Sequence, residues 1–262
     1  MGKDNKKTMK NYGFQPPVIE ESDFWLGSGK LGSQIINEKG DWTAYLPAME
    51  WQNKGNETNC CVSFGTLSAL EILHKFLYGV EPNYSDRFLC KISDTGPNGN
   101  DPKKVSNALR HCGSVPEEEY PFVIPLDEFF KEIPPEIVDM GKSWLKNFEV
   151  GYEYVAKDKL KEALKRSPVG CAVQAWNQNE LGEYIRLGAS NHWVVLVAFD
   201  EFDRPIIWDS YDKGIKILEK GYELDFPQIY TLKKKQDIEV QKFYEKEKNW
   251  FIGILKRLFK WT

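Results

Sequence analysis

Three side chains in this sequence have the types and the settings that thiol chemistry requires. Cys61 follows a polar loop and begins a run with helical character, and His192 lies 131 residues after it. Asp209 lies 148 residues after Cys61, directly behind the apolar run 206–208. A cysteine attacks a carbonyl as its thiolate, which a helix N-terminus and an adjacent imidazolium both favour. We therefore predict that Cys61 is a nucleophile, that His192 is its base, and that Asp209 orients the histidine.

Two residues close to Cys61 in the chain bear on this chemistry. Gln52 precedes Cys61 by nine residues. Its side-chain N–H could donate to an oxyanion together with the backbone N–H of Cys61, although Gln52 could equally be an ordinary loop residue. Cys60 competes with Cys61 for the role of nucleophile. If Cys61 is the nucleophile, we expect Cys60 to be a small buried residue on the preceding turn.

The periodicity of apolar residues predicts the elements that would position these side chains. From Cys61 to about Tyr78 there is no proline and one glycine, and apolar residues recur at helical spacing, which predicts a largely buried helix. Shorter helices are expected at 103–111 and 157–166. The β-rich runs that follow lie at 169–176, 192–199, 206–208 and 215–218. A helix-rich first half and a strand-rich second half predict an α+β fold with two lobes.

The chain divides into four parts on this basis. Residues 1–40 contain several prolines and glycines without a helical period, and we expect an irregular extension that wraps the surface. Residues 41–150 would form the helical lobe and residues 151–232 the β-rich lobe. Residues 233–262 end in a basic amphipathic helix. Such a helix suits docking to a membrane surface or to a protein, or packing on its own domain.

The predicted strands supply a geometric test of the histidine and aspartate pairing. His192 opens one strand, Asp209 closes the next, and residues 200–205 carry the turn between them. Antiparallel neighbours have a constant sum of residue numbers. A turn centred near Glu201 would therefore place His192 directly beside Asp209.

Composition narrows the class of protein further. The net charge of −4 shows no basic excess, so we expect no nucleic-acid partner. The polar N-terminus lacks a signal-peptide core, and the five cysteines are an odd number. We therefore expect free thiols in a protein that is cytoplasmic or carried in a particle assembled inside a cell. No Cys-x-x-Cys or His-x-x-x-His spacing occurs, so we expect no metal site.

These motifs resemble the papain-like cysteine peptidases, in particular compact members of bacterial or phage type. The spacings of 131 and 148 residues match the interval between the family's cysteine and its histidine and asparagine. Phe64 and Glu71, three and ten residues after Cys61, match the family's helix and favour Cys61 over Cys60. Further similar motifs are Asp41-Trp42, Pro97-Asn-Gly-Asn100, Glu119-Tyr-Pro-Phe122, Ser167-Pro-Val169 and Asp209-Ser-Tyr211.

Some positions depart from the family's pattern. Val62 and Tyr211 stand where the family has tryptophan, and Asp209 stands where it has asparagine. Other Cys-His-Asp enzymes use an aspartate in this role. Thr58 and Pro97 occupy two cysteine positions of the family, so its disulfide at that place is absent.

The resemblance implies a two-lobe fold in which a helical lobe carries the Cys61 helix. An antiparallel β-sheet or barrel lobe would carry His192 and Asp209. It implies a cysteine endopeptidase that acts on peptide or protein substrates through an acyl-enzyme, without a cofactor. Two alternatives remain: a Cys-His-Asp acyl transferase or transglutaminase-like enzyme, and a catalytically inactive papain-like binding module. The N-terminal extension is short for the family's inhibitory prosegment and lacks its helical pattern, so no zymogen is predicted.

Overall fold

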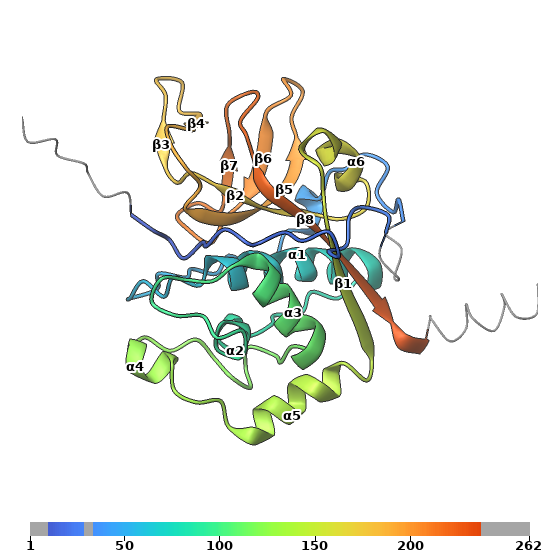
Figure 1. The fold of residues 1–262 in the computed structure, drawn as a ribbon, viewed down its shortest axis with the longest axis vertical. Helices are drawn as coiled ribbons and strands as arrows, with labels where there is room; N and C mark the ends of the chain where they lie inside the picture. Colours follow the sequence, from blue (N-terminus) through green and yellow to red (C-terminus); the bar gives the residue numbers. More distant parts are fainter. Residues whose placement is uncertain (1–9, 29–33, 237–262) are drawn as a thin grey trace, which may run out of the picture.

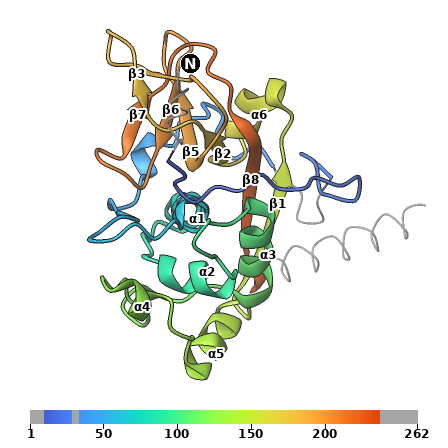
Figure 2. The ribbon, with the colours of Figure 1, turned by 60° about the vertical axis from the view of Figure 1, so that its left-hand side comes forward.

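A computed structural model describes residues 10–28 and 34–236 of the chain. A β-sheet forms one half and a group of helices forms the other, with α1 (Cys61–Tyr78) between them (Figure 1). Figure 2 shows α1 nearly end-on, with the sheet on one side and α2 and α3 on the other. The predicted α+β fold with two lobes is confirmed.

The helical half is built around α1, and the predicted helix bounds there are confirmed. Thirteen of its 18 residues are buried. Gly65, one turn after Cys61, explains how closely this helix approaches the sheet, because a Cβ there would lie 2.7 Å from Cδ1 of Trp193. The other helices are η1 (Thr43–Tyr45), α2 (Asp86–Ile92), α3 (Pro102–Cys112), α4 (Leu126–Phe129), α5 (Pro135–Trp144), η2 (Lys157–Lys159) and α6 (Leu160–Leu164).

The main sheet is antiparallel, with strand order β1-β8-β2-β5-β6-β7. Its strands are β1 (Phe148–Tyr154), β2 (Val169–Val173), β5 (His192–Phe199), β6 (Pro205–Trp208), β7 (Ile215–Ile217) and β8 (Asp225–Lys234). A small second sheet pairs β3 (Asn177–Gln178) with β4 (Tyr184–Ile185). The predicted strand at 192–199 is confirmed, whereas β1 and β8 were not predicted.

The hairpin between β5 and β6 has a different register from the predicted one. Val195 pairs with Trp208 and Phe199 with Pro205, and the register shifts between Leu196 and Ala198. These pairs place the centre of the turn near residue 202, so Asp209 is not directly opposite His192. The two side chains still meet, because Asp209 lies just beyond the end of β6 and reaches His192 diagonally.

The N-terminal extension runs along the junction between the two halves of the molecule (Figure 1). The backbone of Tyr12 bonds to Asn191 beside the sheet, and that of Gly13 bonds to Asn100 in the helical half. Phe14 is buried between them. Residues 10–28 otherwise lie mostly at the surface, and Phe14 enters the interior because burial of its apolar ring is favourable.

At the other end of the chain, β8 continues to Lys234, two residues into the predicted tail. The amphipathic helix predicted for the tail falls on residues outside the described ones. Among the helices that are described, none has the length and apolar character needed to span a membrane.

A disulfide joins Cys60, directly before α1, to Cys90 on α2. The expectation of free thiols throughout is wrong for this pair, and so is the expectation that Cys60 only fills space. The two cysteines are 30 residues apart in sequence, and their Cα atoms come within 5.9 Å only through the packing of α1 on α2. The disulfide also removes the support that free thiols gave to a reducing compartment, and it leaves Cys61 as the free thiol at the start of α1.

Four carboxyl groups lie near one another in the helical half, and Glu71 on α1 is one of them. The four are Glu50, Glu71, Asp86 and Glu117. Glu71 accepts a hydrogen bond from the Tyr84 backbone, and Glu117 accepts one from the Phe122 backbone. Burial raises the pKa of each of the four, that of Glu117 to about 7. A carboxyl group with a raised folded-state pKa binds more protons in the folded than in the unfolded protein. Stability therefore falls as the pH rises between the two pKa values.

We expect Glu117→Gln to weaken this pH dependence. In the wild type the free energy of unfolding should fall between about pH 4.5 and pH 7, and in Glu117→Gln it should fall by about 1–2 kcal/mol less. Urea denaturation at both pH values measures the difference, with exposed Glu118→Gln as the matched control. Equal falls in the wild type and Glu117→Gln would contradict the prediction.

Candidate active site

His192 and Asp209 form a fully buried pair at the edge of the sheet. His192 is the first residue of β5 and Asp209 follows β6. Nε2 of His192 donates to Oδ1 of Asp209 at 2.6 Å, and both side chains are completely buried. Nδ1 of His192 has no hydrogen-bond partner within the described part of the chain. The pairing fixes the ring and leaves Nδ1 as the nitrogen that can exchange a proton with another group.

The second oxygen of Asp209 is held by Lys216, a residue that the sequence analysis did not single out. Nζ of Lys216 donates to Oδ2 of Asp209 at 2.7 Å and to the carbonyl of Tyr211 at 2.8 Å. The lysine side chain is completely buried, and its ammonium lies 5.1 Å from the ring centre of Trp176. No sequence signal marks this residue, because the alternation Ile215-Lys216-Ile217 predicts an exposed lysine, whereas the structure buries it and exposes both isoleucines.

Cys61 begins α1 with its side chain completely buried. Its sulfur bonds to the backbone of Trp193, the residue after His192. Burial raises the pKa of the Cys61 thiol well above its usual value; the bond to Trp193 opposes this, and the charges of Asp209 and Glu57 reinforce it. Burial therefore favours the neutral thiol over the thiolate in this arrangement. The described residues contain no hydrogen bond between Cys61 and His192.

Gln52 lies fully buried beside the segment that carries Asp209. Its Oε1 accepts a bond from the Ser210 hydroxyl at 2.8 Å. Its Nε2 donates to the Tyr12 carbonyl at 3.0 Å and to Oε1 of Glu57 at 2.8 Å. The structure thus brings Gln52 next to the histidine and aspartate pair, with its amide hydrogens already engaged.

Residues 10–15, which we call the strap, lie directly over these side chains. The ring of Tyr12 packs 5.4 Å from that of His192 and 5.2 Å from that of Tyr211, measured between ring centres. The Tyr12 N–H donates to the Asn191 carbonyl at 3.0 Å, and the Asn191 side chain donates to the Lys10 carbonyl at 2.8 Å. The strap therefore covers the face of His192.

The strap also pairs with the helical half through an isolated parallel β-bridge between Phe14 and Asn100. The Gln15 N–H donates to the Asn100 carbonyl and the Asn100 N–H donates to the Gly13 carbonyl, each at 2.9 Å. Gly13 is required there, because its φ is +106° and a Cβ would lie 1.9 Å from the Asn59 carbonyl oxygen. Phe14 stacks on Trp193. The segment is anchored to both lobes.

Glu57 connects the strap to the site, and the sequence analysis did not single it out. Its carboxylate accepts hydrogen bonds from the Gln52 amide and the Tyr211 hydroxyl. It also lies 3.4 Å from Nζ of Lys10 on the strap. No sequence motif marks this role, because two of its partners, Lys10 and Tyr211, are distant in the sequence.

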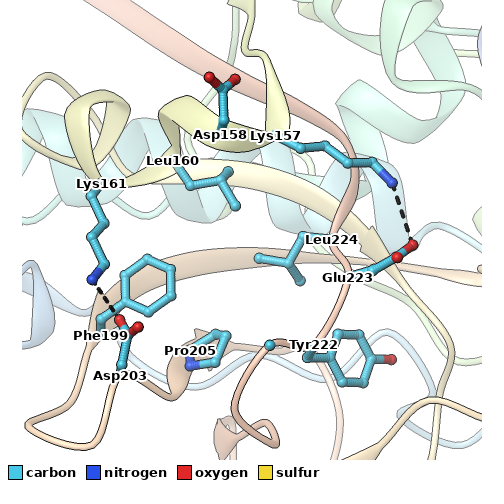
Figure 3. Close-up of a pocket in the computed structure, with 11 residues that line it drawn as sticks. Lys157, Asp158, Leu160, Lys161, Phe199, Asp203, Pro205, Tyr222, Glu223 and Leu224 are labelled. Carbon is cyan, nitrogen blue, oxygen red and sulfur yellow. Dashed lines mark ion pairs between the residues drawn. The ribbon is translucent and has the colours of Figure 1, made fainter.

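A pocket lies elsewhere, on the β-rich half (Figure 3). Leu160, Phe199 and Leu224 line it together with two ion pairs, Lys161–Asp203 and Lys157–Glu223. Phe199 is the last residue of β5 and His192 is the first, so the pocket is a full strand length from the histidine. Residues 10–28 and 34–236 contain no group of three or more side chains that could hold a metal ion.

Comparison with known proteins identifies the fold. No family model and no curated protein matches the sequence. Solved structures do match. Xylellain, a cysteine protease from Xylella fastidiosa, superposes with a TM-score of 0.62 at 17% identity, covering 85% of this chain and 97% of its own. Digestive procathepsin L 3 of Tenebrio molitor gives 0.56 at 15%, covering 80% and 73%. Bromelain from Ananas comosus, solved with the E64 inhibitor, gives 0.51 at 14%, covering 74% and 96%.

These structures are papain-like cysteine proteases, and the likeness extends over most of this chain. At such identities the comparison establishes the architecture and not the chemistry. The protein has the papain-like peptidase fold.

The contacts of the strap predict that loosening it exposes the thiol. Lys10→Ala combined with Tyr12→Ala removes the ring from His192 and the ammonium from Glu57, while Phe14 and the backbone pairing stay. Aromatic contacts contribute about 0.5–1.5 kcal/mol each, so iodoacetamide should alkylate Cys61 about tenfold faster in this variant. Peptide mapping by mass spectrometry follows the rate, with exposed Val18→Ala as control. Unchanged rates would show that the strap does not limit access.

Proposed function

We propose that the protein is a cysteine-type endopeptidase that hydrolyses peptide bonds through an acyl-enzyme on Cys61. The observation that carries this proposal is the buried hydrogen bond between His192 and Asp209, next to a free thiol at a helix start in a papain-like fold. Within this pair, Nδ1 of His192 has no partner among the described residues. The residue after His192, Trp193, bonds through its backbone to the Cys61 thiol.

The catalytic roles follow from these positions. Nδ1 of His192 takes the proton of Cys61, whose sulfur attacks the peptide carbonyl. The side-chain amide of Gln52 and the backbone N–H of Cys61 donate to the oxyanion. His192 then protonates the leaving amine and activates water, which releases the acyl group and restores the thiol. Asp209 holds the ring throughout and supports the imidazolium.

The structure corresponds, in this proposal, to a covered state that does not turn over. Gln52 donates to Tyr12 and Glu57 instead of an oxyanion, and the thiol is out of contact with solvent. When the strap leaves, water reaches Cys61 and removes much of the desolvation that raises its pKa. The substrate is a peptide or protein chain that takes the place of the strap.

A second candidate is a catalytically inactive papain-like binding module. The specific observation in its favour is the complete burial of Cys61, which raises the pKa of its thiol. In that case the strap would be a permanent part of the fold. Hydrolysis by the strap-loosened protein separates the two candidates.

We expect Cys61→Ala to lose hydrolysis of a fluorescent casein by about 1,000-fold or more, and His192→Ala to lose a similar amount, since the groups act as a unit. Both are measured in the Lys10→Ala/Tyr12→Ala background. Cys112→Ser, which removes another free thiol outside the site, is the matched control. Casein hydrolysis that survives Cys61→Ala would overturn the assignment.

A further inference from the structure

Lys216 is an unusual choice for its position. Its strand presents two isoleucines to solvent, 46% and 37% exposed, and turns the lysine into the interior, 2% exposed. A sheet edge would normally bury the isoleucines and expose the lysine. Burying an ammonium is costly unless it is paired and hydrogen-bonded. The hydrogen bond of Lys216 to Asp209 offsets part of this cost.

The contacts of Lys216 govern both the geometry and the charge of Asp209. Because Oδ2 is bound to the ammonium at 2.7 Å, Oδ1 is the oxygen left to face His192 at 2.6 Å. The second bond of Lys216, to the Tyr211 carbonyl, ties the lysine to the backbone two residues beyond Asp209. The carboxylate is thereby fixed at both ends.

Charge balance distinguishes this arrangement from a lone carboxylate. An unneutralised carboxylate would stabilise an imidazolium on His192 and disfavour a thiolate on Cys61. With a cation on its other oxygen, the same carboxylate offers His192 an acceptor with little net charge. The Asp209–Lys216 pair then resembles a neutral amide, because it accepts a hydrogen bond from His192 and carries little net charge.

We propose that Lys216 is a positioning residue for the thiol chemistry, which orients Asp209 towards His192 and cancels its charge so that the aspartate acts as a neutral hydrogen-bond acceptor. The proposal rests on the proposed roles of Cys61 and His192. It predicts that removing the charge of either Lys216 or Asp209 alone shifts the pH at which Cys61 reacts. Removing both charges should shift it little.

The test compares Lys216→Met, Asp209→Asn and the double variant in the strap-loosened background. The readout is the pH profile of Cys61 alkylation by iodoacetamide, which needs no peptidase activity. Lys216→Met leaves a bare negative charge and should move the profile to higher pH by about one unit; Asp209→Asn leaves a bare positive charge and should move it to lower pH by a similar amount. The double variant should return to within about 0.3 unit of the parent.

Exposed Lys213→Met, three residues from Lys216, is the matched control and should leave the profile unchanged. If Lys216→Met does not fold, the opposite shift in Asp209→Asn and its reversal in the double variant still test the charge balance. Two singles that shift in the same direction, or a double variant that fails to return, would overturn the role of Lys216. A purely structural ion pair predicts no opposed shifts.

Casein hydrolysis separates this proposal from the proposed function. Opposed and cancelling shifts without any hydrolysis by the parent would support Lys216 as a positioning residue and reject the endopeptidase. Hydrolysis by the parent, together with unshifted pH profiles in all variants, would support the endopeptidase and reject Lys216 as a positioning residue. When both proposals hold, the double variant should recover at least about tenfold in kcat/KM over either single variant, as expected for residues that act as a unit.

Discussion

The buried row of His192, Asp209 and Lys216 is the constraint on which the rest of the site depends. Each member is removed from water, so each must find its partners within the protein. Those partners come from β5, the end of β6 and β7, which are consecutive neighbours in the sheet. The two hairpins that join these strands therefore fix the chemistry as well as the fold. A change of register in either hairpin would leave a buried charge unpaired.

The helical lobe contributes the thiol, and its approach to the sheet is equally constrained. Gly65 lets α1 come against Trp193, which brings the first residue of that helix to the strand that begins with His192. The Cys60–Cys90 disulfide ties the same end of α1 to α2. The strap then closes the assembly from outside. Its contacts to Gln52 and His192 occupy the groups that catalysis would use, and Cys61 is buried in the same arrangement.

Local patterns predicted the elements that carry the chemistry. The helix from Cys61 to Tyr78 and the strand from His192 to Phe199 were predicted with their bounds, because each is a long apolar run with clear ends. The meeting of His192 with Asp209 was predicted from the hairpin. The predicted register was wrong, since the shift between Leu196 and Ala198 has no signature in the sequence.

Most of the features that were missed depend on contacts between distant segments. β1 and β8 pair across some 80 residues, and the Cys60–Cys90 disulfide depends on how α1 packs against α2. Glu57 acquires its role only when Lys10 and Tyr211 come together from distant parts of the chain. The path of the strap was missed for the same reason, because nothing within residues 10–15 shows that both lobes offer it partners. Lys216 was missed for another reason: its partners Asp209 and Tyr211 are near in sequence, but the alternation of β7 predicts an exposed lysine.

The central claim is that Cys61 becomes an activated nucleophile once the strap leaves. The most direct measurement is labelling by E-64, an epoxide that alkylates activated thiols, followed by intact mass and peptide mapping. The full chain and the Lys10→Ala/Tyr12→Ala variant are compared, each with and without His192→Ala. We predict a single adduct on Cys61, faster in the strap-loosened variant and absent without His192. A folded, strap-loosened protein that forms no adduct, or forms it on another cysteine, would contradict the claim.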